Sequence, residues 1–294
     1  VMICGAAAGL NVVLKTILNP GDEVIILALY FVEYVYYIDN HGGVPVAVPT
    51  NDTFQPDIST LEPFITARTK AIIINSPNNP SGAVYSHKTL TELGSLIQKK
   101  ESAFGNVIFM LSDEPYRRIL FDGLSYDHIF QYHHASIAIH SHSKDLALPG
   151  ERIGYIAVNP GFTDNKPLID GLTFCNRILG FVNAPALMQH LICALQGVSV
   201  DPSNYERKRD YLYERLIQMG YSVVKPQGAF YMFPRAPIED DTEFVAQLQQ
   251  WNVLTVPGTG FGSPGYFRIS YCVDDSVIDG AIDGFKKAIG KVKL

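Results

Sequence analysis

The sequence predicts an α/β protein with two domains. The large domain, residues 1–196, is expected to have three α/β/α layers around a mostly parallel sheet, and the smaller C-terminal domain, residues 197–294, to be α+β. Two patterns lead to this prediction. Short apolar runs alternate with segments of helical length in the first half of the chain, which is typical of a parallel sheet covered on both faces. After about residue 196 this alternation stops.

The strands of the large domain are expected where β-branched and other apolar residues run together. Between several of these runs lie segments of helical length, such as 86–102, which begins at Ser86. In sheets of this kind, ligands sit at the carboxyl ends of the strands, and the unusual polar residues of this chain follow those ends. The expected strands are 23–27, 44–48, 70–75, 106–111, 135–140 and 152–158.

The C-terminal part begins with a long polar helix, predicted over 203–220. Three short runs, "GAFYMF", "NVLTVP" and "YFRISYC", follow it, and a closing helix is expected from about residue 275. This order predicts a smaller α+β domain hinged on the long helix.

The composition excludes several classes of protein. The chain has 294 residues, 47% of them hydrophobic and 18% charged, so it can bury a large core. Its 23 Lys+Arg stand against 29 Asp+Glu, giving a net charge of −6, and no basic run predicts nucleic acid as a partner. The four cysteines form no metal-binding or disulfide pattern, which favours a cytoplasmic protein. No apolar run is long enough to predict a membrane span.

The stretch "SHSKDLALPGERIGY", residues 141–155, places a lysine at the end of a predicted buried strand. Buried strands rarely end in lysine, so Lys144 is a candidate nucleophilic amine that forms a Schiff base. Ser141, Ser143 and Arg152 are candidates to gather an anion beside it. The alternative is an ordinary lysine in a solvated loop.

Two further stretches offer polar groups to a ligand. In "CGAAAGL", Gly5, Ala6 and Ala7 begin a predicted helix, where free backbone N–H groups can hold a phosphate, although tight packing also explains small residues there. In "NSPNNPSG", Pro80 restricts Asn79 to an extended backbone, which aims its amide from a strand end into the crevice. A simple turn is the alternative.

The stretch "SDEPYRRI" ends a predicted strand with Asp113 and, three residues later, Tyr116. An acidic residue in this place often caps a turn or a helix. The functional alternative is a carboxylate that faces a cationic ring nitrogen, with a phenol beside it.

Taken together, these motifs resemble the pyridoxal-phosphate enzymes of the aspartate aminotransferase type, which are class I/II aminotransferases of fold type I. The resemblance covers essentially the whole chain. The motifs "GAAAGL", "NNPSG", "DEPY", "SHSK" with "ERIGY", and "FRIS" occur in the family's order and at family-like spacing.

The resemblance implies a role for each matching residue. Lys144 corresponds to the lysine that holds pyridoxal 5'-phosphate covalently and shuttles protons, and Asp113 to the carboxylate paired with the pyridine nitrogen. Tyr116 and Asn79 correspond to the groups that hydrogen-bond the ring's phenolate oxygen, and Phe31 to the aromatic residue that stacks on the ring. The residues that match the family's phosphate site are Gly5, Ala6, Ala7, Ser141, Ser143 and Arg152.

The resemblance also implies the reaction and the partners. Arg268 matches the arginine that grips the substrate α-carboxylate, and Asn79 lies at the same substrate site. The implied activity is ping-pong transfer of an amino group between an α-amino acid and a 2-oxo acid, by a homodimer. The family has an N-terminal segment, on the order of a hundred residues by the usual size of domains, which covers the active site and crosses to the partner subunit. We expect that segment to be absent here.

Alternatives to this function remain at the level of the sequence. The same scaffold hosts β-eliminating C–S lyases, and an aminotransferase-like domain can serve as the ligand sensor of a transcriptional regulator. His140 and His142 would share one face of a strand, with His133 and His134 nearby, but no neighbouring Cys or carboxylate is expected to complete a site, so no metal is predicted. Arg177 is a candidate for a second substrate carboxylate, or an exposed helix residue.

Overall fold

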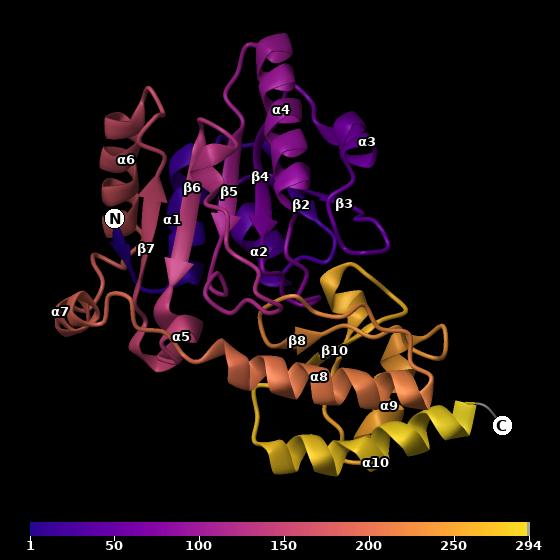
Figure 1. The fold of residues 1–294 in the computed structure, drawn as a ribbon. Helices are drawn as coiled ribbons and strands as arrows, with labels where there is room; N and C mark the ends of the chain where they lie inside the picture. Colours follow the sequence, from indigo (N-terminus) through magenta and orange to yellow (C-terminus); the bar gives the residue numbers. More distant parts are fainter. Residues whose placement is uncertain (293–294) are drawn as a thin grey trace.

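The computed structural model describes residues 1–292 and contains two β-sheets (Figure 1). The main sheet has seven strands, and the predicted α/β class with a mostly parallel sheet is confirmed. From one edge to the other, its strands are β1 (Met2–Ile3), β7 (Gly154–Val158), β6 (Ser136–Ser141), β5 (Phe109–Asp113), β4 (Thr69–Asn75), β2 (Glu23–Leu27) and β3 (Val44–Val48).

Strands β3, β2, β4, β5 and β6 are parallel to one another, whereas β7 runs antiparallel to β6, and β1 antiparallel to β7. The register places Ser141, at the end of β6, opposite Gly154, at the start of β7. The start of β7 therefore lies at the same end of the sheet as the carboxyl ends of the parallel strands. We call this end the carboxyl edge. All six predicted strands are present, with ends shifted by up to three residues, as in β5, which begins at Phe109.

The helices that follow these strands cover both faces of the main sheet (Figure 1). Alternate residues of β4 enter separate cores: Ile73 packs in the core that includes α1, whereas Ile72 and Ile74 pack in the core that includes α4. Burial on both faces explains why these strands are continuously apolar. The helices of this part are α1 (Ala6–Ile17), α2 (Glu33–Asp39), α3 (Ile58–Leu61), α4 (His87–Phe104), α5 (His142–Asp145), α6 (Asn165–Ile178) and α7 (Ala186–Ala194), and the 3-10 turns are η1 (Glu62–Phe64), η2 (Ile129–Gln131) and η3 (Pro149–Glu151).

The C-terminal part forms a three-stranded antiparallel sheet in the order β8-β10-β9, with helices packed around an aromatic core. Phe244, Phe267 and Phe285 are buried in that core. The division of the chain at residue 196 stays a prediction. The elements here are α8 (Pro202–Met219), β8 (Tyr231–Met232), α9 (Asp241–Gln249), β9 (Val256–Pro257), η4 (Gly258–Phe261), β10 (Phe267–Ser270) and α10 (Asp275–Val292).

The two sheets meet through the chain that leads into β8. Ala229 N–H donates to the carbonyl of Ile119, and Gln227 N–H donates to the carbonyl of Gly82. Loops that follow strands of the main sheet thus hydrogen-bond this segment directly. The contact brings β8 and β10 next to the carboxyl edge of the main sheet. Among residues 1–292, no helix combines the length and the apolar character needed to span a bilayer.

Candidate active site

A cavity of about 360 Å³ lies at the carboxyl edge of the main sheet, next to the second sheet. Residues from both sheets and from the start of α1 contribute to its wall. Its lining residues include Ala6, Ala7, Leu10, Phe31, Asn75, Asn79, Asp113, Pro115, Tyr116, Ser141, Ser143, Lys144, Pro149, Arg152, Tyr231 and Arg268.

Lys144 lies in α5, a single helical turn that directly follows β6. Ser141 caps this turn, since its hydroxyl accepts a hydrogen bond from the backbone N–H of Ser143. The Lys144 amine lies 5.5 Å from the centre of the Phe230 ring. Burial lowers the pKa of Lys144, and the positive charges of Arg268 and Arg152 act in the same direction. A lysine with a lowered pKa is more readily a neutral nucleophile or base.

Asp113 is the last residue of β5. It is 6% exposed and forms part of the cavity wall. The Tyr34 hydroxyl donates to Asp113 Oδ2 over 2.5 Å. Asp113 Oδ1 is also buried but has no hydrogen-bond partner among the described residues. Burial raises the pKa of Asp113 to about 7, although the bond from Tyr34 opposes the shift. A cation in the cavity would therefore be strongly favoured beside this carboxylate.

Asn75 fixes the positions of two neighbouring loops. Its amide Nδ2 donates to the carbonyl of Asp113 over 2.9 Å, and its Oδ1 accepts from Asn79 N–H over 2.7 Å. Asn79 Oδ1 in turn accepts from Arg268 Nη1 over 3.0 Å. The Asn79 amide thus faces the cavity from a strand end, next to a group from the second sheet.

Arg268 is held by aromatic rings as well as by Asn79. Its guanidinium lies 4.8 Å from the centre of the Tyr231 ring and 5.0 Å from that of Phe261. Its Nε is buried and unpaired within the part of the chain that the structure describes. Tyr231 also contacts Tyr116, with 3.1 Å between the two hydroxyl oxygens. A planar guanidinium with free donors in a cavity is suited to a carboxylate ligand.

Gly5 and Arg152 meet at the side of the cavity formed by α1. Gly5 has φ +83°, and a Cβ built on it would lie 2.5 Å from Arg152 Nη2, so a larger residue would collide with the guanidinium. Arg152 also donates to the carbonyls of Pro149, over 2.8 Å, and Cys4, over 3.3 Å. The Ser141 and Ser143 hydroxyl oxygens are 2.6 Å apart. These donors and the start of α1 surround space suited to an anion.

The histidines on either side of Ser141 correct one expectation. His142 begins α5 and does not continue the strand, and a carboxylate does adjoin the pair. His140 Nε2 is 3.1 Å from Asp145 Oδ2, and His142 Nδ1 is 3.3 Å from both oxygens of that carboxylate. Burial alone would raise the pKa of Asp145, but the hydrogen bonds from His140 and His142 lower it overall. This cluster links the turn that carries Lys144 to the end of β5. His140 Nδ1 is 2.8 Å from the carbonyl oxygen of Glu114, the residue that follows β5.

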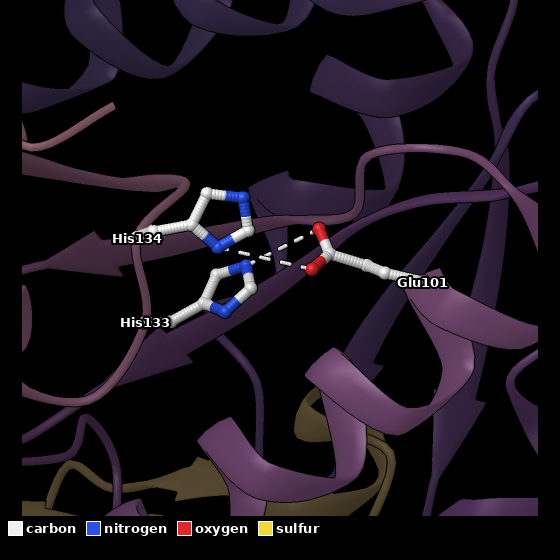
Figure 2. Close-up of side chains that lie close together, drawn as sticks. All are labelled: Glu101, His133 and His134. Atoms are coloured by element: carbon white, nitrogen blue, oxygen red, sulfur yellow. Dashed lines mark ion pairs between the residues drawn. The ribbon is translucent and has the colours of Figure 1, made fainter. Parts of the chain in front are cut away.

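His133 and His134 lie just before β6, at the amino ends of the parallel strands, which we call the amino edge. Figure 2 shows both rings pointing toward the carboxylate of Glu101, at distances of 3.5 Å and 3.8 Å. Backbone groups engage the same atoms, since His133 Nε2 lies 2.9 Å from the carbonyl of Ile108 and Glu101 Oε1 accepts from Ile108 N–H over 2.9 Å. Hydrogen bonds to the backbone thus engage His133 and Glu101, and this cluster is separate from the cavity.

Almost all of the predicted site residues line the same cavity, and Gly5 adjoins it through Arg152. Arg177 does not, because it lies exposed on α6. The sequence analysis missed Tyr34, Asn75 and Tyr231, which support Asp113, Asn79 and Tyr116. Asn75 ends a buried strand, and that position alone could have drawn attention to it. No pattern distinguishes Tyr34 from the tyrosines beside it in "EYVYY".

The chain matches the family model described as aminotransferase class I and II over residues 1–285. The chain belongs to this family. It is 32% identical to a probable aspartate/prephenate aminotransferase from Thermus aquaticus, over 98% of this chain and 75% of the relative, and 33% identical to aromatic-amino-acid aminotransferase 2 from Thermococcus litoralis, over 96% and 73%. A crystal structure of an amino transferase from Eubacterium rectale superposes with a TM-score of 0.97 at 41% identity, covering 100% of this chain and 74% of that one.

Family membership makes this chain an aminotransferase, an enzyme that moves an amino group between an α-amino acid and a 2-oxo acid. The family uses pyridoxal phosphate. This aminotransferase spans about three quarters of the length of the relatives it matches.

Proposed function

We propose that this aminotransferase binds pyridoxal 5'-phosphate in the cavity at the carboxyl edge of the main sheet and holds it covalently through Lys144. The observation that carries the proposal is that a half-buried amine and a buried carboxylate lie in the wall of one cavity. Lys144 offers an amine whose pKa burial lowers, and Asp113 offers a buried carboxylate oxygen without a partner in the described chain. A cofactor with an aldehyde and a basic ring nitrogen satisfies both groups.

The other groups of the cavity fit the remainder of that cofactor. Arg152, the Ser141 and Ser143 hydroxyls and the N-terminus of α1, where Ala6 and Ala7 lie, provide donors for its phosphate. Phe31 provides an apolar ring for its aromatic face. Tyr116 and Asn79 provide polar side chains for the ring oxygen. The absence of a side chain at Gly5 leaves room for the Arg152 guanidinium at this site.

When bound, pyridoxal phosphate supplies an electron-accepting ring that stabilises the negative charge left on the substrate α-carbon after loss of a proton. Asp113 keeps the ring nitrogen protonated, because the buried carboxylate gains a cationic partner. Lys144 would hold the cofactor covalently, and its amine, when free, would be placed to take a proton from the substrate α-carbon and to return one, as a general acid and base held in place by α5. Two such half-reactions give the ping-pong exchange.

For the substrate, we propose an α-amino acid whose carboxylate is bound by Arg268 together with Asn79. The rings of Tyr231 and Phe261, whose centres lie 4.8 Å and 5.0 Å from its guanidinium, hold Arg268 in the cavity wall. The two relatives are named for aspartate, prephenate and aromatic amino acids. We therefore propose aspartate and aromatic amino acids as the first amino donors to test, and 2-oxo acids as acceptors.

We also propose that the enzyme is a cytoplasmic homodimer. Several large apolar side chains on α6 and α7 are exposed, among them Phe174, Ile178 and Leu187, with exposed fractions of 62%, 52% and 79%. A second copy of the chain would cover these side chains, since large apolar side chains are commonly buried where subunits meet. The four cysteines are free thiols, as expected in a reducing compartment. Sedimentation of the purified protein tests the dimer, and a Leu187→Asp variant should shift it toward monomer.

The test of the cofactor proposal is the visible absorption of the purified protein with added pyridoxal phosphate. We expect a new band that is absent from Lys144→Ala and present in the matched control Lys166→Ala, whose lysine lies on α6, outside the cavity wall. No band, or a band that survives Lys144→Ala, overturns the proposal. An amino-donor panel with 2-oxoglutarate then tests the activity. Release of pyruvate and ammonia from a cysteine conjugate without an oxo-acid acceptor would instead support a C–S lyase.

A further inference from the structure

Tyr231 lies where the two sheets meet and contacts a proposed ligand-binding group from each. It is the first residue of β8, and the register of β8 and β10 places it opposite Ser270, close to Arg268. Its side chain leaves the second sheet and reaches Tyr116, which follows β5 of the main sheet. Tyr231 is 8% exposed and Tyr116 is 4% exposed, so water does not readily replace either contact.

The two hydroxyl groups are 3.1 Å apart, and either one can donate to the other. Each hydroxyl has a single hydrogen. If Tyr116 donates to Tyr231, it has no hydrogen left for a ligand in the cavity. If Tyr231 donates to Tyr116, the hydrogen of Tyr116 is free to point at an acceptor, and both hydrogens are used. A hydrogen-bond acceptor in the cavity therefore favours the arrangement in which Tyr231 donates to Tyr116 and Tyr116 donates to that acceptor. The bond from Tyr231 then strengthens the bond that Tyr116 donates.

The ring of Tyr231 has a separate contact. The Arg268 guanidinium lies 4.8 Å from its centre and 5.0 Å from the centre of the Phe261 ring. A cation placed over an aromatic face is attracted to it, and two rings restrict the plane of the guanidinium. This contact depends on the ring and does not require the hydroxyl.

We propose that Tyr231 is a positioning residue that aligns the cofactor side and the substrate side of the cavity at once. Its hydroxyl turns the O–H of Tyr116 toward the cofactor's ring oxygen, and its ring holds Arg268 in the plane that receives the substrate carboxylate. This inference rests on the proposed function of the cavity.

Two substitutions separate the two contacts. Tyr231→Phe removes the hydroxyl and keeps the ring, whereas Tyr231→Leu removes both. Tyr266→Phe is the matched control, because Tyr266 precedes β10, stacks on Phe233 and does not line the cavity. Two quantities are measured on the cofactor-loaded protein: the pH midpoint of the absorption change of the bound cofactor, and the KM of the amino donor.

In Tyr231→Phe, the pH midpoint should rise by about 0.5 to 1 unit, because a hydrogen bond to an anionic oxygen lowers the basicity of the group beside it. KM should stay within about twofold of the wild-type value, since the cation–π contact remains. Tyr231→Leu should show the same rise in midpoint and an increase in KM of about 5- to 30-fold, the range expected for a desolvated cation–π contact. Tyr266→Phe should change neither quantity.

An unchanged midpoint in Tyr231→Phe would overturn the hydroxyl role, and an unchanged KM in Tyr231→Leu would overturn the ring role. A wild-type protein without a Lys144-dependent band would overturn the proposed function together with this inference. If the wild-type band is present and the midpoint does not move, only the inference fails. If Tyr231→Leu does not fold, Tyr231→Met, which also lacks the aromatic ring, takes its place beside Tyr231→Phe and still separates the two roles.

Discussion

The two edges of the main sheet carry similar side chains in different situations. At the carboxyl edge, Asp113 Oδ1 and Arg268 Nε are buried in or beside a cavity, and neither has a partner in the described chain. At the amino edge, Glu101 and His133 are each bound to the backbone of Ile108. Burying a polar group without a hydrogen bond costs free energy, so native structures rarely leave it unpaired without a reason.

The type of residue alone therefore does not identify a functional site. Paired histidines and a glutamate are typical metal ligands, yet backbone hydrogen bonds explain the amino-edge cluster. An aspartate at a strand end is a common cap, yet one carboxylate oxygen of Asp113 has no hydrogen-bond partner among residues 1–292. Open hydrogen-bonding capacity that coincides with a cavity is the better guide. The same open capacity away from a cavity, as at Asn106 Oδ1, carries no such meaning.

The largest expected effect comes from Lys144→Ala. Loss of the general acid and base alone should lower kcat by about 10²- to 10⁴-fold, and loss of the covalent attachment should add to this. Steady-state transamination, with cofactor in excess, measures it. Activity within tenfold of the wild type would show that another residue moves the proton.

Asp113→Asn tests whether the unpaired carboxylate is costly without the cofactor. The pKa of Asp113 is raised from 3.8 to about 7, so the folded state binds more protons than the unfolded state between these values. The free energy of unfolding of the cofactor-free protein should therefore fall as pH rises from about 4 to about 7. The Asp113→Asn variant lacks this pH-dependent fall. Above pH 7, its free energy of unfolding should exceed that of the wild type by on the order of 4 kcal/mol.

Urea unfolding of both proteins at about pH 5 and about pH 8 measures this difference. Added pyridoxal phosphate should stabilise the wild type more than the variant, because a cationic ring nitrogen pairs only with the charged carboxylate. Parallel pH profiles for the two proteins would contradict the raised pKa.

Arg268→Lys should have a smaller effect, confined to the substrate. Lysine keeps the charge but loses the paired donors and the stacking on Tyr231, so kcat/KM should fall by about 10- to 100-fold. The cofactor band should keep its pH midpoint within about 0.3 unit, because the arginine is proposed to bind the substrate and not the ring. A large loss of cofactor affinity would place Arg268 at the wrong end of the cavity.

His134→Ala should have the smallest effect. The His134 side chain is 48% exposed and its nitrogen is 3.8 Å from Glu101, so its loss should change the free energy of unfolding by less than about 1 kcal/mol. Activity should be unchanged, also after treatment with a chelator. A chelator-sensitive activity that the substitution abolishes would show that the amino edge holds a functional metal.

Much of the fold and of the site could be predicted from the sequence, for identifiable reasons. Strands buried on both faces are continuously apolar, which is why β2, β4 and β6 could be located closely. Residues at their carboxyl ends could then be assigned to one edge, and Lys144 and Asp113 are both found there.

The site residues that the sequence did not indicate contact residues that lie far from them in the sequence. Tyr34 reaches Asp113 from another element, and Tyr231 reaches Tyr116 from the second sheet. Asp145 follows Lys144 directly, but only the turn of α5 brings its carboxylate to His140. No local pattern encodes such contacts, because each depends on how separate elements pack.

Asp113 and Lys144, at the carboxyl edge, are proposed to hold the cofactor. Reducing the pyridoxal-phosphate-treated protein with borohydride and mapping the modified lysine by peptide mass spectrometry tests this proposal. We expect one modified position, Lys144, and no modification there when a phosphate-bearing analogue of the cofactor occupies the cavity. Modification of a lysine outside the cavity wall, such as Lys70 at the amino edge, with Lys144 unmodified, would contradict it.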